Sequence, residues 1–326
     1  MTSGGELIIY GKGEMNDYED GEQPWNSYKS EIKEITILRG ITTIESNAFN
    51  GITNIEGLII PDNVISIGSY SISSCSNLES LILPESIQTI NDYGIFNCPK
   101  LSNVYHLSNI SIQSIGNYVF DQCNVNSIHV GLHYDETFLN KQIIKATGLC
   151  GSNAYYHLNS DNSTLLIYGT GNLTDYNFDN NSKLNVKNIH WFQKRSKISN
   201  VQISYGIKHI GSCSFVEFSN ITTLTIPETV ISLGNNICEK CYILETLVIR
   251  SRYITTIDYN SFNYCPKLSS LSYYGSSIPN CIKSSSGGEC NGCHFCDNSC
   301  NILNHMKVRK TYTGSSFCDL GVDKIL

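Results

Sequence analysis

The residues best suited to chemistry form a cysteine cluster close to the C-terminus of the chain. Cys290, Cys293, Cys296 and Cys300 follow the spacing C-x2-C-x2-C-x3-C. Thiolates at this spacing can hold an iron–sulfur cluster. Zinc is chemically easier, because thiolates with His294 would satisfy a tetrahedral site, and the proline typical of iron–sulfur sites is missing after the fourth cysteine. Disulfides or unstructured free thiols are the interpretation that we favour for this segment over zinc or an iron–sulfur cluster.

The rest of the chain lacks the motifs of known catalytic sites. It has no Gly-rich phosphate loop, no H-E-x-x-H and no G-x-S-x-G. Gly11-Lys12-Gly13 and Gly169-Thr170-Gly171 resemble nucleotide loops only loosely, and a turn after a strand explains both. We therefore predict that the protein is not an enzyme and that it needs no cofactor, apart from the zinc considered for the cysteine cluster.

Most of the chain repeats one pattern with a period of about 23 residues. A branched aliphatic residue is followed five positions later by Phe, Ile or Cys and eight positions later by Cys or another apolar residue. The pattern begins at Ile44, Ile67, Ile90, Ile115, Ile210, Leu233 and Ile257. Such a unit cannot bury its apolar face alone and must stack on its neighbours, so the pattern predicts a leucine-rich solenoid.

Short alternating runs of Leu-x-x-Leu-x-Leu type lie between these marks, and each predicts a strand. We expect a curved, mainly β stack with one short strand per repeat, the strands pairing in parallel and in register. The expected strand centres are Ile35, Leu58, Leu81, Val104, Ile128, Val201, Leu224, Leu247 and Leu271.

The alternation also predicts which side chains leave the core. If Leu81 and Leu224 point inward, their neighbours in each strand point outward and form a ladder across the repeats. This ladder is almost uncharged and suits a shallow protein or glycan contact. The candidate binding residues are Tyr105, His129, Gln202, Thr225, Val248, Arg250 and Tyr274. Binding through the loops instead is the alternative.

Other cysteines share one phase of the repeat and therefore form columns inside the predicted stack. Cys75, Cys98 and Cys123 make one column, and Cys241 and Cys265 make a second. We interpret them as small buried hydrophobic side chains that fill a tight turn, without a metal or disulfide role.

In addition to the short repeat, a longer segment of the sequence is duplicated. Leu7-Ile8-Ile9-Tyr10-Gly11 and the residues up to Tyr18 match the run from Leu165 to Tyr176. We therefore divide the chain into a first module at 1–146, a second at 147–280 and a cysteine-rich tail at 281–326. The first module lacks the segment that precedes the matching run in the second, so we expect it to be incomplete at its N-terminus.

These motifs together resemble a known family. The run from Gly148 to Leu158, the Leu165–Gly171 strand and turn, and repeats of the form Ile-Gly … Phe-x-x-Cys-x-x-Leu are similar to the BspA-like leucine-rich repeat proteins. Pro24-Trp25 fits the corresponding segment of the first half. The resemblance implies the solenoid fold, and by analogy a surface antigen or adhesin that binds a protein or glycan on another cell or on the matrix.

The composition of the chain excludes one class of partner, and its sequence leaves open where in or outside the cell the protein is located. A net charge of −7 argues against nucleic acid as a partner. Neither a signal peptide nor an apolar run long enough for a membrane span is visible. The resemblance implies a cell-surface or extracellular protein, and the alternative is a cytoplasmic interaction scaffold with a zinc-binding or redox tail. A third hypothesis places a redox or metal activity in the tail, with the solenoid only positioning it.

Overall fold

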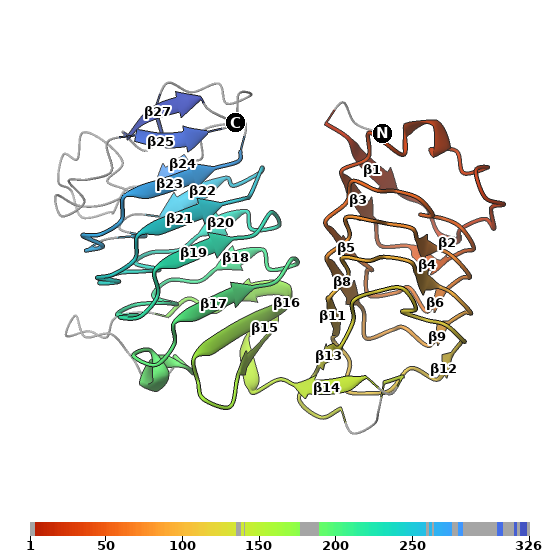
Figure 1. Ribbon diagram of the computed structural model, residues 1–326, viewed down its shortest axis with the longest axis horizontal. Coiled ribbons are helices and arrows are strands. Elements are labelled where there is room, and N and C mark those ends of the chain that lie inside the picture. The colour runs from red at the N-terminus through yellow and green to blue at the C-terminus, as the bar shows by residue number, and fades with distance from the viewer. Residues whose placement is uncertain are drawn as a thin grey trace. The chain divides into compact units, whose positions relative to one another are not determined.

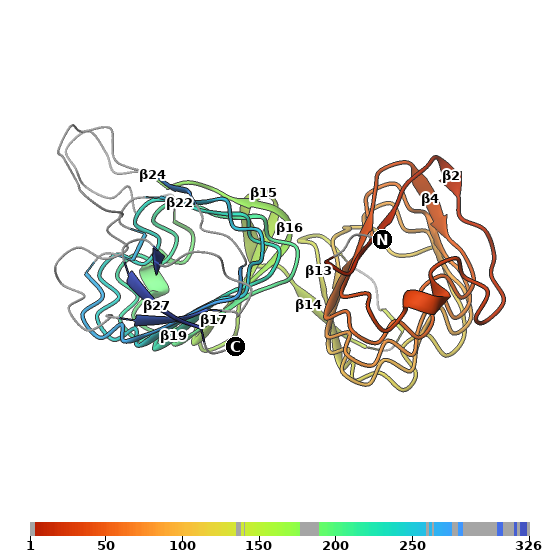
Figure 2. The same cartoon turned by 90° about the horizontal axis from the view of Figure 1, so that it is seen from above.

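The computed structural model is mainly β and consists of two units, Met1–Ala146 and Thr147–Leu326, each of which is a stack of repeats. It describes residues 4–134, 138–139, 141–176, 189–258, 261–262 and 264–275, and the backbone of the strands at 280–282, 305–308, 316–317 and 320–324. Seen along the stacking direction, the turns of each unit superimpose around a central core (Figure 2).

In the first unit, the repeats from β5 onward each contribute a principal strand to one parallel sheet. This five-stranded sheet has the order β14-β13-β11-β8-β5 (Figure 1). Its strands are β5 (Gly57–Ile59), β8 (Ser80–Leu83), β11 (Asn103–His106), β13 (Ser127–Val130) and β14 (Gln142–Lys145). Leu58 pairs with Leu81, Leu81 with Val104, and Val104 with Ile128, so the strands are in register. The predicted parallel stack is therefore confirmed.

Most repeats of the first unit also add a second, shorter strand. The strands β2 (Gly13–Glu14), β4 (Ile41–Ile44), β6 (Ser66–Ile67), β9 (Thr89–Ile90) and β12 (Ser114–Ile115) form a second parallel sheet. Two further pairs complete the unit: β1 (Glu6–Ile9) with β3 (Glu34–Ile37), and β7 (Ile72–Ser73) with β10 (Ile95–Phe96). A repeat thus turns between two sheets that enclose the core.

The second unit repeats this plan. Its principal strands are β17 (Asn200–Ile203), β19 (Thr223–Ile226), β21 (Thr246–Ile249) and β23 (Ser270–Tyr273), and its shorter ones are β18 (His209–Ile210), β20 (Ser232–Leu233), β22 (Thr256–Asp258) and β24 (Asn280–Ile282). Beyond them, β25 (His305–Val308) and β27 (Leu320–Lys324) extend the sheet of β23 in parallel, and β26 (Ser316–Phe317) pairs with β27. The segment expected to be a separate tail therefore contributes strands to this unit.

The second unit begins with an antiparallel hairpin that the repeat pattern did not predict. It joins β15 (Gly148–Leu158) to β16 (Thr164–Leu173), with a register shift between Ser152 and Ala154. β16 then pairs in parallel with β17. The hairpin therefore covers the edge of the stack at which the first repeat begins.

The core of each unit is built from the side chains that the alternation turned inward. Leu58, Leu81 and Val104 are completely buried in the first unit. Leu224 and Leu247 are their counterparts in the second unit. Burial of such side chains stabilises each by about 1.5–3 kcal/mol, which makes the apolar stack the main source of stability.

The duplicated segment has the same structural role in both units. Asp17 Oδ1 accepts the N–H of Ser46, and Asp175 Oδ1 accepts that of Ser212, so each carboxylate holds the turn of the following repeat. The tyrosine after each aspartate meets a tryptophan edge-on. The indole N–H groups donate to carbonyls of the following repeat, from Trp25 to Ala48 and from Trp191 to Ser214. The 3-10 helices η1 (Asn26–Tyr28) and η3 (Phe192–Lys194) follow directly.

Candidate functional site

The outward side of β19, β21 and β23 carries two columns of small side chains. Thr225 lies beside Val248, which lies beside Ser272. Two positions earlier, Thr223, Thr246 and Ser270 form a parallel column. All six side chains are partly or fully exposed, whereas the residues between them are buried. We call this surface the strand face.

Larger polar groups flank the strand face. Gln202 on β17 is exposed, and Arg250 and Tyr274 directly follow β21 and β23. The Arg250 guanidinium lies 3.8 Å from the Glu228 carboxylate, and Arg250 remains exposed. These residues place amide, guanidinium and phenol groups beside the hydroxyl groups of the strand face.

The corresponding surface of the first unit differs from the expectation. Tyr105 projects from β11 away from the core cluster, yet it is only 3% exposed, and the neighbouring Ile82 is 0% exposed. The Tyr105 ring stacks on that of His129, with 5.3 Å between the ring centroids. Burial raises the pKa of the Tyr105 hydroxyl. Tyr105 is therefore buried in this structure, whereas the alternation alone predicted an exposed side chain. His129 remains partly exposed.

A serine, a histidine and an aspartate form a hydrogen-bonded chain that the sequence did not reveal. His209 Nδ1 lies 2.7 Å from Ser232 Oγ, and His209 Nε2 lies 3.3 Å from Asp175 Oδ1. Asp175 Oδ1 also accepts the hydroxyl of Ser212 at 2.7 Å. Burial acts to raise the pKa of Asp175, but the bonds from Ser212 and His209 outweigh it and lower the pKa below the ordinary value.

This chain of bonds differs from a serine-hydrolase triad. In such a triad the serine bonds Nε2 and the carboxylate bonds Nδ1, the reverse of the arrangement at His209. Ser232 also lies within a parallel ladder, where the nearby N–H groups of Ile231 and Gly234 donate to the carbonyls of Lys208 and Ile210. These N–H groups are thus engaged and offer no oxyanion hole for an acyl intermediate. The arrangement fits a structural link between neighbouring repeats.

The cysteine columns have a recurring structural role. Cys241 Sγ donates to the Phe215 carbonyl at 3.1 Å, and Cys75 Sγ to the Phe49 carbonyl at 3.3 Å. A thiol therefore satisfies a buried carbonyl of the preceding repeat, for which its weak donor is sufficient. Burial raises the pKa of Cys238 and of Cys241, so these thiols stay protonated at neutral pH and are poor nucleophiles.

The expected metal ligands Cys290, Cys293, Cys296 and Cys300 lie outside the described residues. Within the described part of the chain, no group of three or more His, Cys, Asp or Glu side chains could hold a metal ion. No helix there has the length and apolar character needed to cross a bilayer.

Comparison with solved structures returned leucine-rich repeat proteins of bacteria. One from Eubacterium ventriosum is 20% identical, with 85% of this chain and 83% of that chain covered and a TM-score of 0.35. A leucine rich cell surface protein from Faecalibacterium prausnitzii is 17% identical over 79% of this chain and 67% of its own, with a TM-score of 0.29. The pneumococcal vaccine antigen PcpA is 14% identical over 95% and 68%, with a TM-score of 0.29. Similarities this low carry no argument about this chain.

The sequence itself carries the assignment. No curated protein matches the chain. The BspA type leucine rich repeat region, however, matches in 6 copies over residues 26–145 and 188–295, which is more than half of the chain. These matches cover the principal strands β5 to β13 and β17 to β23 described above. The chain therefore belongs to the BspA-type leucine-rich repeat family.

Proposed function

We propose that this protein is a non-enzymatic binding protein, a surface antigen or adhesin, and that the strand face of its second unit binds a protein or glycan of a host cell or matrix. One observation carries the proposal: β19, β21 and β23 present two partly exposed columns of small side chains above a buried apolar core. A rigid surface of this kind can bind without reordering, which lowers the entropic cost of association.

The side chains at the strand face suit a shallow contact. Thr225 and Ser272 offer hydroxyls that donate and accept, Val248 offers a small apolar surface, and Arg250 and Tyr274 belong to the residue types enriched at binding interfaces. Few charges interrupt the surface, so little desolvation of charged groups would oppose binding.

Binding to a panel of purified matrix proteins and immobilised glycans tests the proposal. The strand-face variant combines Thr225→Ala, Val248→Ala, Arg250→Ala and Tyr274→Ala. We expect wild-type protein to bind at least one panel member and this variant to bind it at least about tenfold more weakly, as expected when interface anchors are truncated.

The matched control changes two exposed turn residues of the same unit, Tyr242→Ala and Lys267→Ala. It should bind as wild type. Loss of binding by this control, together with unchanged binding by the folded strand-face variant, would place recognition in the turns. Failure of the wild-type protein to bind any panel member would contradict the adhesin role.

A further inference from the structure

Three tyrosines of the first unit stack outside the core. Tyr70 and Tyr93 have ring centroids 4.9 Å apart at an interplanar angle of 7°, and Tyr93 and Tyr118 have centroids 4.8 Å apart at 13°. Phe96 packs edge-on against Tyr70 and Tyr93. Tyr118 is 55% exposed and Tyr70 is 38% exposed. We call Tyr70, Tyr93 and Tyr118 the tyrosine ladder.

The backbone at the ladder gives no reason for tyrosine. Tyr70, Tyr93 and Tyr118 have φ of 55°, 55° and 60°, in the left-handed region that bulky residues rarely adopt. The same turn position holds Asn47 and Asn236 in other repeats, and asparagine suits this conformation. Tyrosine at three successive turns is thus locally unfavourable, and none of the three belongs to the core cluster. The ladder is better explained by its exposed surface.

The stacked geometry determines which parts of the rings a partner can reach. The two stacked contacts cover both faces of the Tyr93 ring and one face each of the Tyr70 and Tyr118 rings, so a partner would reach the ring edges and the outer face of Tyr118. Burial is the main cause that raises the pKa of the Tyr93 hydroxyl. The neighbouring tyrosines and the carboxylates of Asp92 and Asp121 raise it further. The Tyr93 phenol therefore remains protonated at neutral pH, and a phenol hydroxyl can both accept and donate hydrogen bonds.

The three turns that carry the ladder are negatively charged. The three turns at 67–74, 90–97 and 115–122 contain Asp92 and Asp121 and no lysine or arginine. Both carboxylates are exposed, and Asp92 Oδ1 accepts the N–H of Asn117 at 2.7 Å, which holds it next to the ladder.

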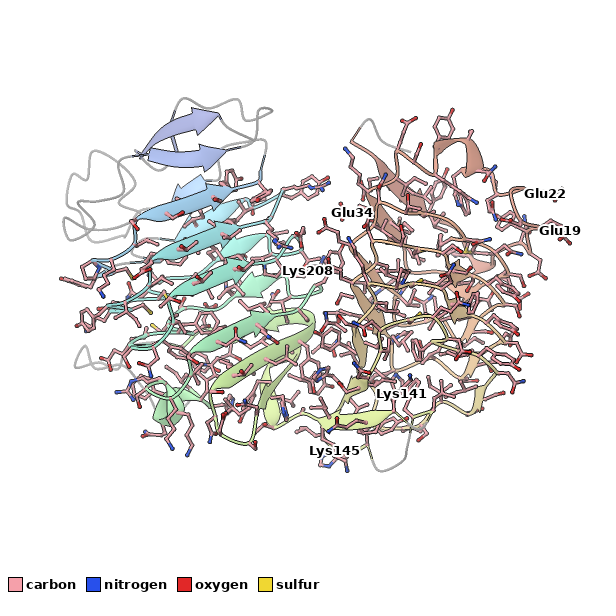
Figure 3. All side chains as sticks on the ribbon, viewed as in Figure 1. Glu19, Glu22, Glu34, Lys141, Lys145 and Lys208 are labelled. Atoms are coloured by element: carbon pink, nitrogen blue, oxygen red, sulfur yellow. The ribbon has the colours of Figure 1, made fainter. Side chains whose placement is uncertain are left out.

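An acidic loop continues this surface at the first repeat. Residues 13–28 contain no lysine or arginine, and their acidic residues, all exposed, are Glu14, Asp17, Glu19, Asp20 and Glu22. Glu19 and Glu22 project outward from the loop on the side of β2 and β4 (Figure 3). Asp20 accepts a hydrogen bond from Asn50, and Asn50 accepts one from Ser73 in the turn of Tyr70. These bonds connect the acidic loop, through the buried Ser73, to the turn that carries Tyr70.

We propose that the tyrosine ladder is a second docking surface, distinct from the strand face, and that it binds a basic, arginine- or lysine-rich segment of a protein partner. Guanidinium and ammonium groups can donate to the phenol oxygens and to Asp92 and Asp121, and a guanidinium can stack on the terminal ring of Tyr118. A neutral glycan would need open ring faces, most of which are covered here. An anionic partner would be repelled by the acidic loop.

Two synthetic peptides test the proposal with the full chain. One alternates arginine with serine and glycine, and the other carries uncharged citrulline in place of each arginine. The ladder variant combines Tyr70→Ala, Tyr93→Ala and Tyr118→Ala. The control variant changes three exposed tyrosines outside the stack and the acidic loop, Tyr10→Ala, Tyr242→Ala and Tyr253→Ala.

By calorimetry at low salt, wild type, control and strand-face variants should bind the arginine peptide equally. The ladder variant should bind at least about tenfold more weakly, and the citrulline peptide should bind poorly. Binding should weaken as salt rises. Circular dichroism verifies folding, and Tyr118→Ala alone serves if the triple variant does not fold. Equal binding by a folded ladder variant, or no binding by wild type, would overturn the proposal. Ladder-dependent binding of a neutral oligosaccharide without peptide binding would overturn the choice of partner.

Discussion

Single residues in this protein have consequences that depend on which way the strand turns them. Leu224 is 0% exposed in the core of the second unit, and Thr225, one residue later, belongs to the strand face. Leu224→Ala should lower the free energy of unfolding by about 2–5 kcal/mol because it leaves a cavity between repeats. Thr225→Ala should change it by less than about 0.5 kcal/mol. Urea unfolding measures both, and equal losses would mean that the strand register is wrong.

The carboxylate of Asp175 makes the stability of the folded protein depend on pH. Its pKa is lower in the folded protein than the ordinary value of 3.8, so the unfolded chain binds the proton more readily. The stabilisation is present above pH 3.8 and is lost as the pH falls through the lower, folded pKa. Asp175→Asn should therefore lower stability at neutral pH and reduce the loss below pH 3.8. Urea unfolding at several pH values gives the free energy of unfolding of both proteins. If it falls below pH 3.8 as steeply in the variant as in the wild type, the role of Asp175 is contradicted.

At the scale of elements, a tryptophan after each copy of the duplicated segment bonds the following repeat, and the two tryptophans are buried to different degrees. Trp191 is 0% exposed and donates to the Ser214 carbonyl at 2.7 Å, whereas Trp25 is partly exposed. Trp191→Phe should leave that carbonyl without its donor and cost about 1–3 kcal/mol. Trp25→Phe should cost less, because Trp25 is already partly exposed to solvent in the folded protein. Urea titration compares the free energies of unfolding of the two variants. A larger loss for Trp25→Phe than for Trp191→Phe would argue against this account.

The elements that the sequence predicted well are those with a period-two pattern and apolar residues. Each expected principal strand, such as those around Leu81 and Leu247, is present at that position. The two-residue strands were missed because so short a segment has no measurable period. The hairpin strand Gly148–Leu158 was not predicted, because its strand conformation depends on pairing with β16 rather than on local alternation.

The candidate surfaces were predictable to different extents. The strand face follows from alternation alone, and Thr225 and Val248 lie where the pattern placed them. The Ser232–His209–Asp175 chain joins residues far apart in sequence, and no local pattern indicates it. The tyrosine ladder did have a signal, because a tyrosine follows Ile67, Ile90 and Ile115 at the same distance.

At the scale of the whole molecule, the reactivity of the buried thiols toward alkylation measures how well the cores of both units are packed. Cys75, Cys98, Cys150, Cys238 and Cys265 are buried, and burial raises the pKa of Cys150 to about 12. We expect these thiols to resist alkylation in the native protein and to react fully once it is unfolded in urea. Site-resolved mass spectrometry measures this, and rapid native labelling of the buried columns would contradict the packing described here.

The central claim, that the repeat stack is a scaffold whose strand face binds the partner, is tested most directly by photo-crosslinking. A benzophenone amino acid is placed at Val248 on the strand face or, as a control, at Asn220, an exposed turn residue of the same unit. With the panel member that the wild-type protein binds, illumination should yield a cross-linked complex from position 248 and little from position 220. Cross-linking from position 220 alone would contradict the claim and place recognition in the turns.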